Sequence, residues 1–226
     1  MTICIAASYS NGQGLVLISD QMVTSHFPMG YEFERDDITK IMPLNDPPTC
    51  YALISGNVIT ANEMLGATKK DVKNKGTNTV DAIAEIARAH FSNVRKLKIL
   101  RAEIEPRGLT LDTYYNNQTK LAPAIIQMID GALRNNDVGV QLIVAGKGDG
   151  GCQLFSITNP GDLNCHDSVG YIAIGSGAPH AVYYLIEHGY KKDLPKEDVL
   201  KLLTEAKARS QVAPGVGNET TTVTVD

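Results

Sequence analysis

The sequence has no excess of basic residues: its 226 residues include 21 Lys and Arg against 25 Asp and Glu, a net charge of −4. Proteins that bind nucleic acids or anionic membranes through charge carry clustered Lys and Arg. No apolar run approaches the roughly 20 residues that span a bilayer, and the N-terminal stretch lacks the basic, apolar and small-residue parts of a secretory signal. We therefore predict a cytoplasmic protein that binds neither nucleic acid nor a membrane.

Sequence motifs for metals, nucleotides and serine nucleophiles are absent as well. The four cysteines are widely spaced and form no C-x-x-C pair, so we expect them to be reduced and structural. The five histidines form no H-x-x-x-H or H-E-x-x-H pattern, and no G-x-S-x-G occurs. The glycines within 146–151 lie between two predicted strands, whereas a phosphate loop would lead into a helix, so they predict a hairpin. We expect no cofactor and no metal.

Strand and helix patterns come in groups rather than in strict alternation. Apolar runs predict strands over 3–7, 15–18, 40–42, 50–54, 138–145, 152–158, 169–174 and 221–225. Helical spacing of apolar residues predicts helices from 59 onward and over 80–103, 123–133, 179–190 and 195–209. We predict an α+β fold in one domain over 1–226, with two mainly antiparallel sheets packed face to face and helices on both outer faces.

The second residue is the first candidate for chemistry. Thr2 follows the initiator Met and stands directly before the first predicted strand. A small second residue favours removal of Met1, and Thr2 then carries a free α-amine with a pKa of about 7.7–8.0. A threonine hydroxyl needs an adjacent base to act as a nucleophile, and this amine lies on the same residue. A Met-Thr start is common, so this pattern alone predicts little.

Two charged residues at the ends of nearby strands strengthen the prediction. Asp20 ends the second strand, and Lys40 opens the third. Hairpin pairing would bring Asp20 back beneath Thr2, and a neighbouring strand would deliver Lys40 to the same place. An ammonium group beside the hydroxyl would lower the hydroxyl pKa, and the carboxylate would hold the ammonium group in position. Taken separately, Asp20 is a turn cap and Lys40 a solvated residue, but the trio predicts a nucleophilic site.

Seven segments extend this pattern along the chain. They are Thr-Ile-Cys-Ile from residue 2, Leu-Val-Leu-Ile-Ser-Asp-Gln-Met-Val-Thr from 15, Thr-Lys-Ile from 39, Leu-Ile-Ser-Gly from 53, Val-Gln-Leu-Ile-Val-Ala-Gly from 140, Ala-Ile-Gly-Ser-Gly from 173 and Gly-Asn-Glu-Thr-Thr-Thr-Val-Thr-Val from 217. In this order the chain resembles the proteasome family, the β-type group of N-terminal nucleophile hydrolases. The resemblance implies a four-layer αββα sandwich, and the extra residues fall mainly at 25–37 and about 104–120.

The resemblance also implies roles for individual residues. Thr2 corresponds to the nucleophile, with its own amine as base directly or through a water, and the enzyme would cleave peptide or other amide bonds. Asp20 matches the family's acidic residue, Lys40 its catalytic lysine, and Ser176 the serine that holds the amine and the catalytic water. Backbone amides near Leu53 to Ser55 would form the oxyanion hole. Maturation would need only the removal of Met1.

Two departures from the family pattern leave an alternative open. Ser210 occupies the place of a family Asp, no acidic residue occurs between Glu205 and Glu219, and Met22 replaces a cationic or hydroxyl-bearing residue. Ser210 is then the remaining support for the N-terminal amine. The alternative is a catalytically inactive, structural ring subunit. A third possibility is a transferase or ligase on the same scaffold, or chemistry at Cys4, which we expect to point into the sandwich.

Family membership further implies a homo-oligomeric ring that encloses its active sites. No sequence motif indicates the number of subunits in the ring or an unfoldase or ATPase partner. Residues 21–31 and 54–59 flank Thr2 in the predicted sheet and are the candidates for substrate contacts. The inserted segment at 103–120 is expected at a rim or at a contact between subunits.

Overall fold

A computed structural model describes residues 2–26 and 32–226, and the strands β1 (Cys4–Tyr9) and β2 (Gly14–Asp20) form the centre of its first sheet. The sheet has the order β10-β1-β2-β11, with β10 at Tyr171–Ile174 and β11 at Thr220–Val225, and every pairing is antiparallel. The turn between β1 and β2 contains Asn11 and Gly12, which both take positive φ angles, +57° and +82°.

The second sheet contains the strands β5 (Ile41–Pro43), β6 (Cys50–Gly56), β7 (Val140–Gly148), β8 (Gly151–Thr158) and β9 (Asp162–Cys165). They are hydrogen-bonded in chain order, again antiparallel. The glycine-rich connection between β7 and β8 is the predicted hairpin. β9 was not predicted, because its polar sequence Asp-Leu-Asn-Cys carries no apolar alternation.

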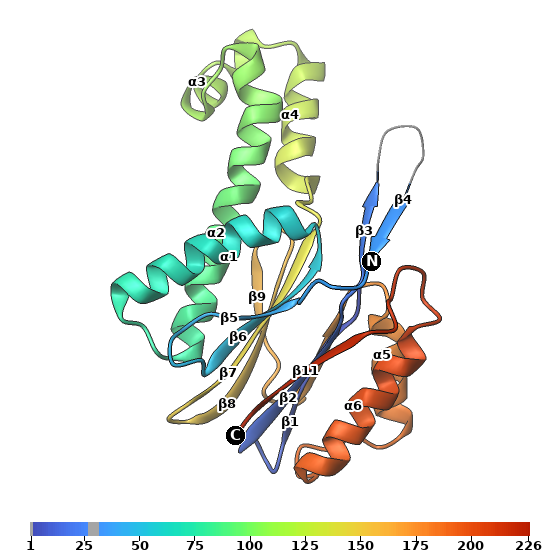
Figure 1. Ribbon diagram of the computed structural model, residues 1–226. Coiled ribbons are helices and arrows are strands. Elements are labelled where there is room, and N and C mark those ends of the chain that lie inside the picture. The colour runs from blue at the N-terminus through green and yellow to red at the C-terminus, as the bar shows by residue number, and fades with distance from the viewer. Residues whose placement is uncertain (1, 27–31) are drawn as a thin grey trace.

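Helices cover the outer face of each sheet (Figure 1). On the second sheet lie α1 (Val58–Lys75) and α2 (Val80–Ile99), and on the first sheet lie α5 (Ala178–Glu187) and α6 (Lys196–Ser210). The order of layers is therefore helix, sheet, sheet, helix. This arrangement confirms the predicted four-layer αββα sandwich.

Strand alternation explains how both faces of β1 are buried. Ile3 and Ile5 pack with residues of α5 and α6, including Leu185 and Leu203. Cys4 and Ala6 point the other way, into the core that the two sheets share. A strand buried on both faces reads as a continuous apolar run, which is why 3–7 was recognisable in the sequence.

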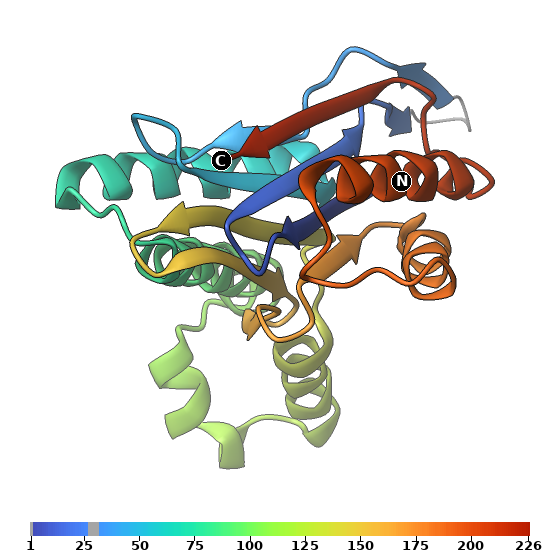
Figure 2. The same cartoon turned by 90° about the horizontal axis from the view of Figure 1, so that it is seen from below.

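The chain between α2 and β7 forms a separate extension (Figures 1 and 2). It comprises a π-helical turn η1 (Leu100–Ile104) that continues α2, the short turns η2 (Glu105–Arg107) and η3 (Gln118–Lys120), and the helices α3 (Leu111–Asn116) and α4 (Pro123–Asn135). Its own small core contains Ile104, Tyr114 and Ile129. Figure 2 shows α3 and α4 lying away from both sheets.

A small hairpin of β3 (Val23–His26) and β4 (Glu32–Arg35) lies beside the N-terminal end of β1 (Figure 1). The sequence predicted only a connection here, since its strands are short and polar. Residues 27–31, part of the predicted substrate-contact stretch, lie outside the described residues. In the part of the chain described, no helix is long and apolar enough to cross a membrane, and no three His, Cys, Asp or Glu side chains gather as metal ligands would.

Candidate active site

Thr2, Asp20 and Lys40 meet where strands of both sheets end. Thr2 lies two residues before β1, and Asp20 is the last residue of β2, the hairpin partner of β1. Lys40 directly precedes β5 in the other sheet, and its carbonyl oxygen accepts a hydrogen bond from the Ile54 N–H at 3.0 Å. The three side chains therefore come together only because the two sheets pack face to face.

The lysine ammonium group joins the other two side chains. Lys40 Nζ lies 2.5 Å from Thr2 Oγ1 and 2.8 Å from Asp20 Oδ1. Exposed fractions are 3% for Thr2, 0% for Asp20 and 1% for Lys40. A buried ion pair requires good geometry and further hydrogen bonds, because both charges lose their hydration. The cluster meets that requirement, and Lys40 Nζ donates to the threonine hydroxyl in a buried position.

Backbone N–H groups fix the Asp20 carboxylate. Its Oδ1 atom accepts from Ile3 N at 3.0 Å, while Oδ2 accepts from Met22 N at 3.2 Å and Gly217 N at 3.1 Å. With Lys40, each carboxylate oxygen accepts two hydrogen bonds, which satisfies an ionised carboxylate. Asp20 is thus held rigidly and in turn fixes the direction of Lys40.

The loop at 175–177 closes the other side of Thr2. The Thr2 N–H donates to Ser176 Oγ at 3.3 Å, and the Gly177 N–H donates to the Thr2 carbonyl oxygen at 3.2 Å. Gly175 has a φ of +98°, and a Cβ atom there would lie 2.2 Å from the Thr2 carbonyl oxygen. Only glycine allows this close approach. The structure therefore brings Ser176 to the predicted place beside the Thr2 nitrogen.

The β6 strand directs its amide groups differently from the prediction for Leu53 and Ser55. Because the Ile54 N–H reaches Lys40 and successive N–H groups alternate between the two edges of a strand, those of Leu53 and Ser55 turn toward β7. The Gly56 N–H turns back to the edge where Lys40 lies. Gly56 has a φ of +95°, and a Cβ atom there would lie 2.0 Å from the Gly139 carbonyl oxygen.

Ser210 is close to the loop at 175–177 but is engaged elsewhere. Ser210 is fully buried, and a Cβ atom placed on Gly177 would lie 2.9 Å from the Cβ atom of Ser210. Its hydroxyl donates to the Ala206 carbonyl oxygen at 2.8 Å, within the same helix, and no hydrogen bond joins Ser210 to Thr2 in the described chain. The structure thus does not bring Ser210 into contact with the Thr2 nitrogen.

Gly217 is a residue of the cluster that reasoning from the sequence missed. It supplies a backbone N–H to Asp20 rather than a side chain, so no residue type signals its role. The available signal was glycine itself, just before the final strand.

Cys4 lies in the core between the sheets, as expected. Its thiol donates to the Ile54 carbonyl oxygen at 3.3 Å and is fully buried. Burial is the main cause that raises the pKa of the Cys4 thiol far above its ordinary value. A thiol that stays protonated is a poor nucleophile, so this environment disfavours chemistry at Cys4.

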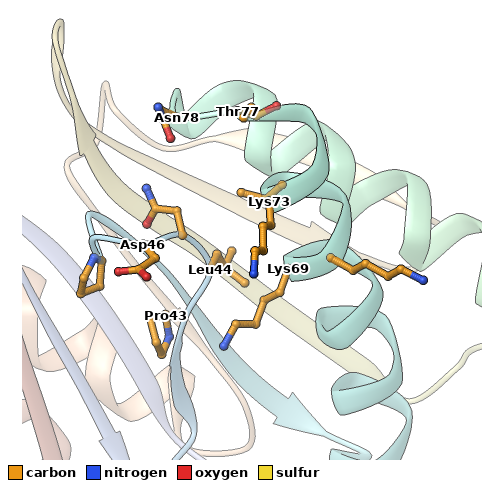
Figure 3. A pocket seen from close by; sticks show the side chains of 12 residues that line it. Pro43, Leu44, Asp46, Lys69, Lys73, Thr77 and Asn78 are labelled. Atoms are coloured by element: carbon orange, nitrogen blue, oxygen red, sulfur yellow. The ribbon is translucent and has the colours of Figure 1, made fainter.

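A large cavity lies elsewhere in the molecule (Figure 3). It has a volume of about 860 Å³ and lies between the β5–β6 connection and the C-terminal half of α1. Lys69 and Lys73 extend from α1 toward Asp46 on the opposite side (Figure 3). None of its lining residues belongs to the cluster around Thr2.

The fold agrees with comparisons to known proteins. The family model described as "Proteasome subunit" matches residues 97–210, just over half of the chain. The chain therefore belongs to the proteasome subunit family, which confirms the resemblance inferred from the sequence. Proteasome subunit beta type-2 of Saccharomyces cerevisiae is 34% identical over 102 residues, covering 44% of this chain. The match spans 37% of the length of that relative.

Proposed function

We propose that this chain is a threonine-type amidohydrolase that cleaves peptide or other amide bonds through an acyl-enzyme on Thr2. The observation that carries the proposal is the 2.5 Å contact between the buried Lys40 ammonium group and the Thr2 hydroxyl, backed by Asp20. A cation beside the hydroxyl stabilises the developing alkoxide. The chemistry requires a free Thr2 amine, so the bond between Met1 and Thr2 must first be cleaved.

In the proposed mechanism, the Thr2 amine accepts the hydroxyl proton directly or through a water. An ordinary α-amine, with a pKa of about 7.7–8.0, has a useful neutral fraction at physiological pH. The Thr2 oxygen attacks the amide carbonyl, and the protonated amine gives its proton to the leaving nitrogen as the C–N bond breaks. A water then gives a proton to the amine and attacks the ester carbonyl carbon. The bond between this carbon and the Thr2 oxygen breaks, the carboxylic acid product leaves, and the Thr2 oxygen takes the proton back from the amine. Ser176, 3.3 Å from the Thr2 nitrogen, holds the amine in place.

A negative oxygen forms during the attack and needs a positioned donor. We assign this role to the Gly56 N–H rather than to the amides of Leu53 and Ser55. Strand alternation turns the Gly56 N–H to the Lys40 edge of β6, while the other two face β7. The need for glycine at 56 follows from the 2.0 Å that would separate a Cβ atom from the Gly139 carbonyl oxygen.

Family membership supports assembly as part of this proposal. We propose a homo-oligomeric ring of single-domain subunits, in which the Thr2 sites face an enclosed space and peptide substrates enter from outside. Residues 54–59 remain candidates for substrate contact, and Ile59 in this stretch is 84% exposed. An exposed apolar side chain at the start of α1 suits an extended peptide with apolar side chains.

The proposal is tested by the intact mass of the purified protein with and without a threonine-directed β-lactone. We expect the loss of one Met and a single adduct, and Thr2→Ala should give no adduct while it still folds and unfolds cooperatively. The Ala variant removes one hydroxyl and keeps the backbone that the Ser176 loop contacts. An equally reactive Thr2→Ala protein would overturn the proposal.

One observation favours the second candidate, a structural ring subunit without activity. The Ser210 hydroxyl is bound to Ala206, and no acidic side chain occurs between Glu205 and Glu219 to orient the Thr2 amine. A mass that still includes Met1, without an adduct, would favour this candidate. Removal of Met1 without an adduct would mean a free but unreactive threonine, and Ser210→Asp would then be the variant to test for recovered reactivity.

A further inference from the structure

Lys207 is a second buried lysine, which the mechanism above does not use. It lies on α6 with 2% of its surface exposed, on the helix face whose Leu203 and Ala206 pack against the first sheet. Lysine is almost never fully buried unless it is paired. In the described residues no carboxylate lies within ion-pair distance of its Nζ atom, so other partners must hold it there.

Two backbone carbonyl groups are those partners. Lys207 Nζ donates to the carbonyl oxygens of Gly217 at 2.9 Å and Asn218 at 2.5 Å. These residues form the turn that leads into β11. Burial lowers the pKa of Lys207, while the nearby carboxylates of Asp20, Asp36 and Glu219 oppose that effect and Lys40 adds to it. Lys207 is thus within the electrostatic surroundings of the Thr2 site.

The turn that Lys207 holds also contacts the site directly. The Gly217 N–H donates to Asp20 Oδ2, and Asp20 binds Lys40, whose Nζ donates to Thr2 Oγ1. The turn is packed tightly, because a Cβ atom on Gly217 would lie 2.4 Å from Asp36 Oδ1 and 2.6 Å from Met22 Cβ. A continuous series of hydrogen bonds therefore runs from Lys207 to the threonine hydroxyl.

We propose that Lys207 is a positioning residue for the Thr2 site, holding the turn at 217–218 so that the Gly217 N–H keeps the Asp20 carboxylate aligned with Lys40. The proposal rests on the proposed function for its effect on reactivity. Its structural part, the ordering of the turn, does not depend on any activity. Lys207 acts through Gly217 and Asp20 and does not touch the reacting atoms.

The test compares Lys207→Met with Lys201→Met, the same change at an exposed position of the same helix. Rates of β-lactone labelling over a range of concentrations separate reversible binding from covalent reaction, and hydrogen exchange reports on residues 214–219. We expect Lys207→Met to slow the covalent step about tenfold, with binding unchanged and faster exchange at 214–219. Lys207→Arg, which keeps the donors, should recover part of the rate, and Lys201→Met should match the wild type.

The two measurements keep the proposals separate. If wild-type protein lacking Met1 does not react with the β-lactone, the proposed function fails, and exchange at 214–219 still decides whether Lys207 orders the turn. Unchanged exchange in Lys207→Met overturns the proposal, as does faster exchange with an unaltered covalent rate. Should Lys207→Met not fold, Lys207→Gln, which keeps amide donors on a shorter side chain, takes its place in both measurements.

Discussion

The corner formed by Thr2, Asp20, Lys40 and Gly217 and the extension between α2 and β7 differ in the sequence separation of the residues that their hydrogen bonds join. In the corner, hydrogen bonds join residues distant in sequence, such as Lys40 with Thr2 and Gly217 with Asp20. In the extension, several join near neighbours, such as Thr110 with Thr113 and Arg107 with Glu103. The corner therefore depends on the whole sandwich, whereas the extension organises itself around its own small core.

The two regions also differ in how they handle charge. The corner buries an ammonium group and a carboxylate with almost no exposure to solvent. The extension keeps its ion pair between Arg107 and Glu103 partly exposed, where such pairs contribute little. Loss of one charge should therefore lower the free energy of unfolding far more in the corner than in the extension. Substitutions in the two regions test this difference.

The largest effect is expected for Lys40→Met. The change leaves the Asp20 carboxylate buried without its ion-pair partner, which should lower the free energy of unfolding by about 3–5 kcal/mol. The same change removes the cation at the Thr2 hydroxyl, so labelling by the β-lactone should fall about 100-fold or more. Denaturant unfolding and labelling rates measure the two effects.

Lys69→Met is the matched control, since Lys69 lies exposed on α1 beside the large cavity. It should change the free energy of unfolding by less than about 0.5 kcal/mol and leave labelling unaffected. A Lys40→Met protein as stable as the wild type would mean that the buried ion pair does not constrain the corner.

The same contrast explains how much the sequence could predict. Buried strands such as β1 and β2 have long apolar runs, so the sandwich was readable from local patterns. Thr2, Asp20 and Lys40 lie at strand ends, where hairpin pairing and strand order fix their mutual position. Sheet topology brings the three side chains together, as the sequence predicted. Their catalytic role is a proposal.

Features that depend on backbone direction were not readable. The side-chain sequence of β6 does not reveal which amides face Lys40, so the oxyanion donors were predicted at Leu53 and Ser55, whose N–H groups turn toward β7. The hydroxyl of Ser210 was expected near the Thr2 nitrogen, but a helix offers serine a closer acceptor four residues back. Within the extension, the helix predicted over 123–133 is confirmed by α4.

A smaller effect is expected for Arg95→Met, which detaches the extension. Arg95 on α2 donates to the carbonyl oxygens of Leu133, Arg134 and Asn136 and to the Asn159 side chain. Loss of these hydrogen bonds should lower the free energy of unfolding by about 2 kcal/mol and speed hydrogen exchange over 100–135. Labelling of Thr2 should not change. A fall in labelling like that of Lys40→Met would show that the two regions are coupled.

The smallest effect is expected for Tyr114→Phe inside the extension. The Tyr114 hydroxyl donates to Asp130 Oδ1 at 2.8 Å, and its loss should lower the free energy of unfolding by about 1 kcal/mol at neutral pH. Burial, together with this hydrogen bond, raises the pKa of Tyr114 to about 12, above the ordinary value of 10.0. Because the unfolded chain loses the proton first, the stabilisation by Tyr114 is complete below about pH 10 and declines as the pH rises toward 12.

The difference in stability between the wild type and Tyr114→Phe should therefore shrink across that range, measured by denaturant unfolding at stepwise pH. Tyr115→Phe is the matched control, because the neighbouring ring is 57% exposed. Its effect should stay below about 0.5 kcal/mol at every pH. A difference for Tyr114→Phe that stays constant from pH 9 to 12 would contradict the proposed role of the buried hydroxyl, and the extension would then be held by its apolar contacts alone.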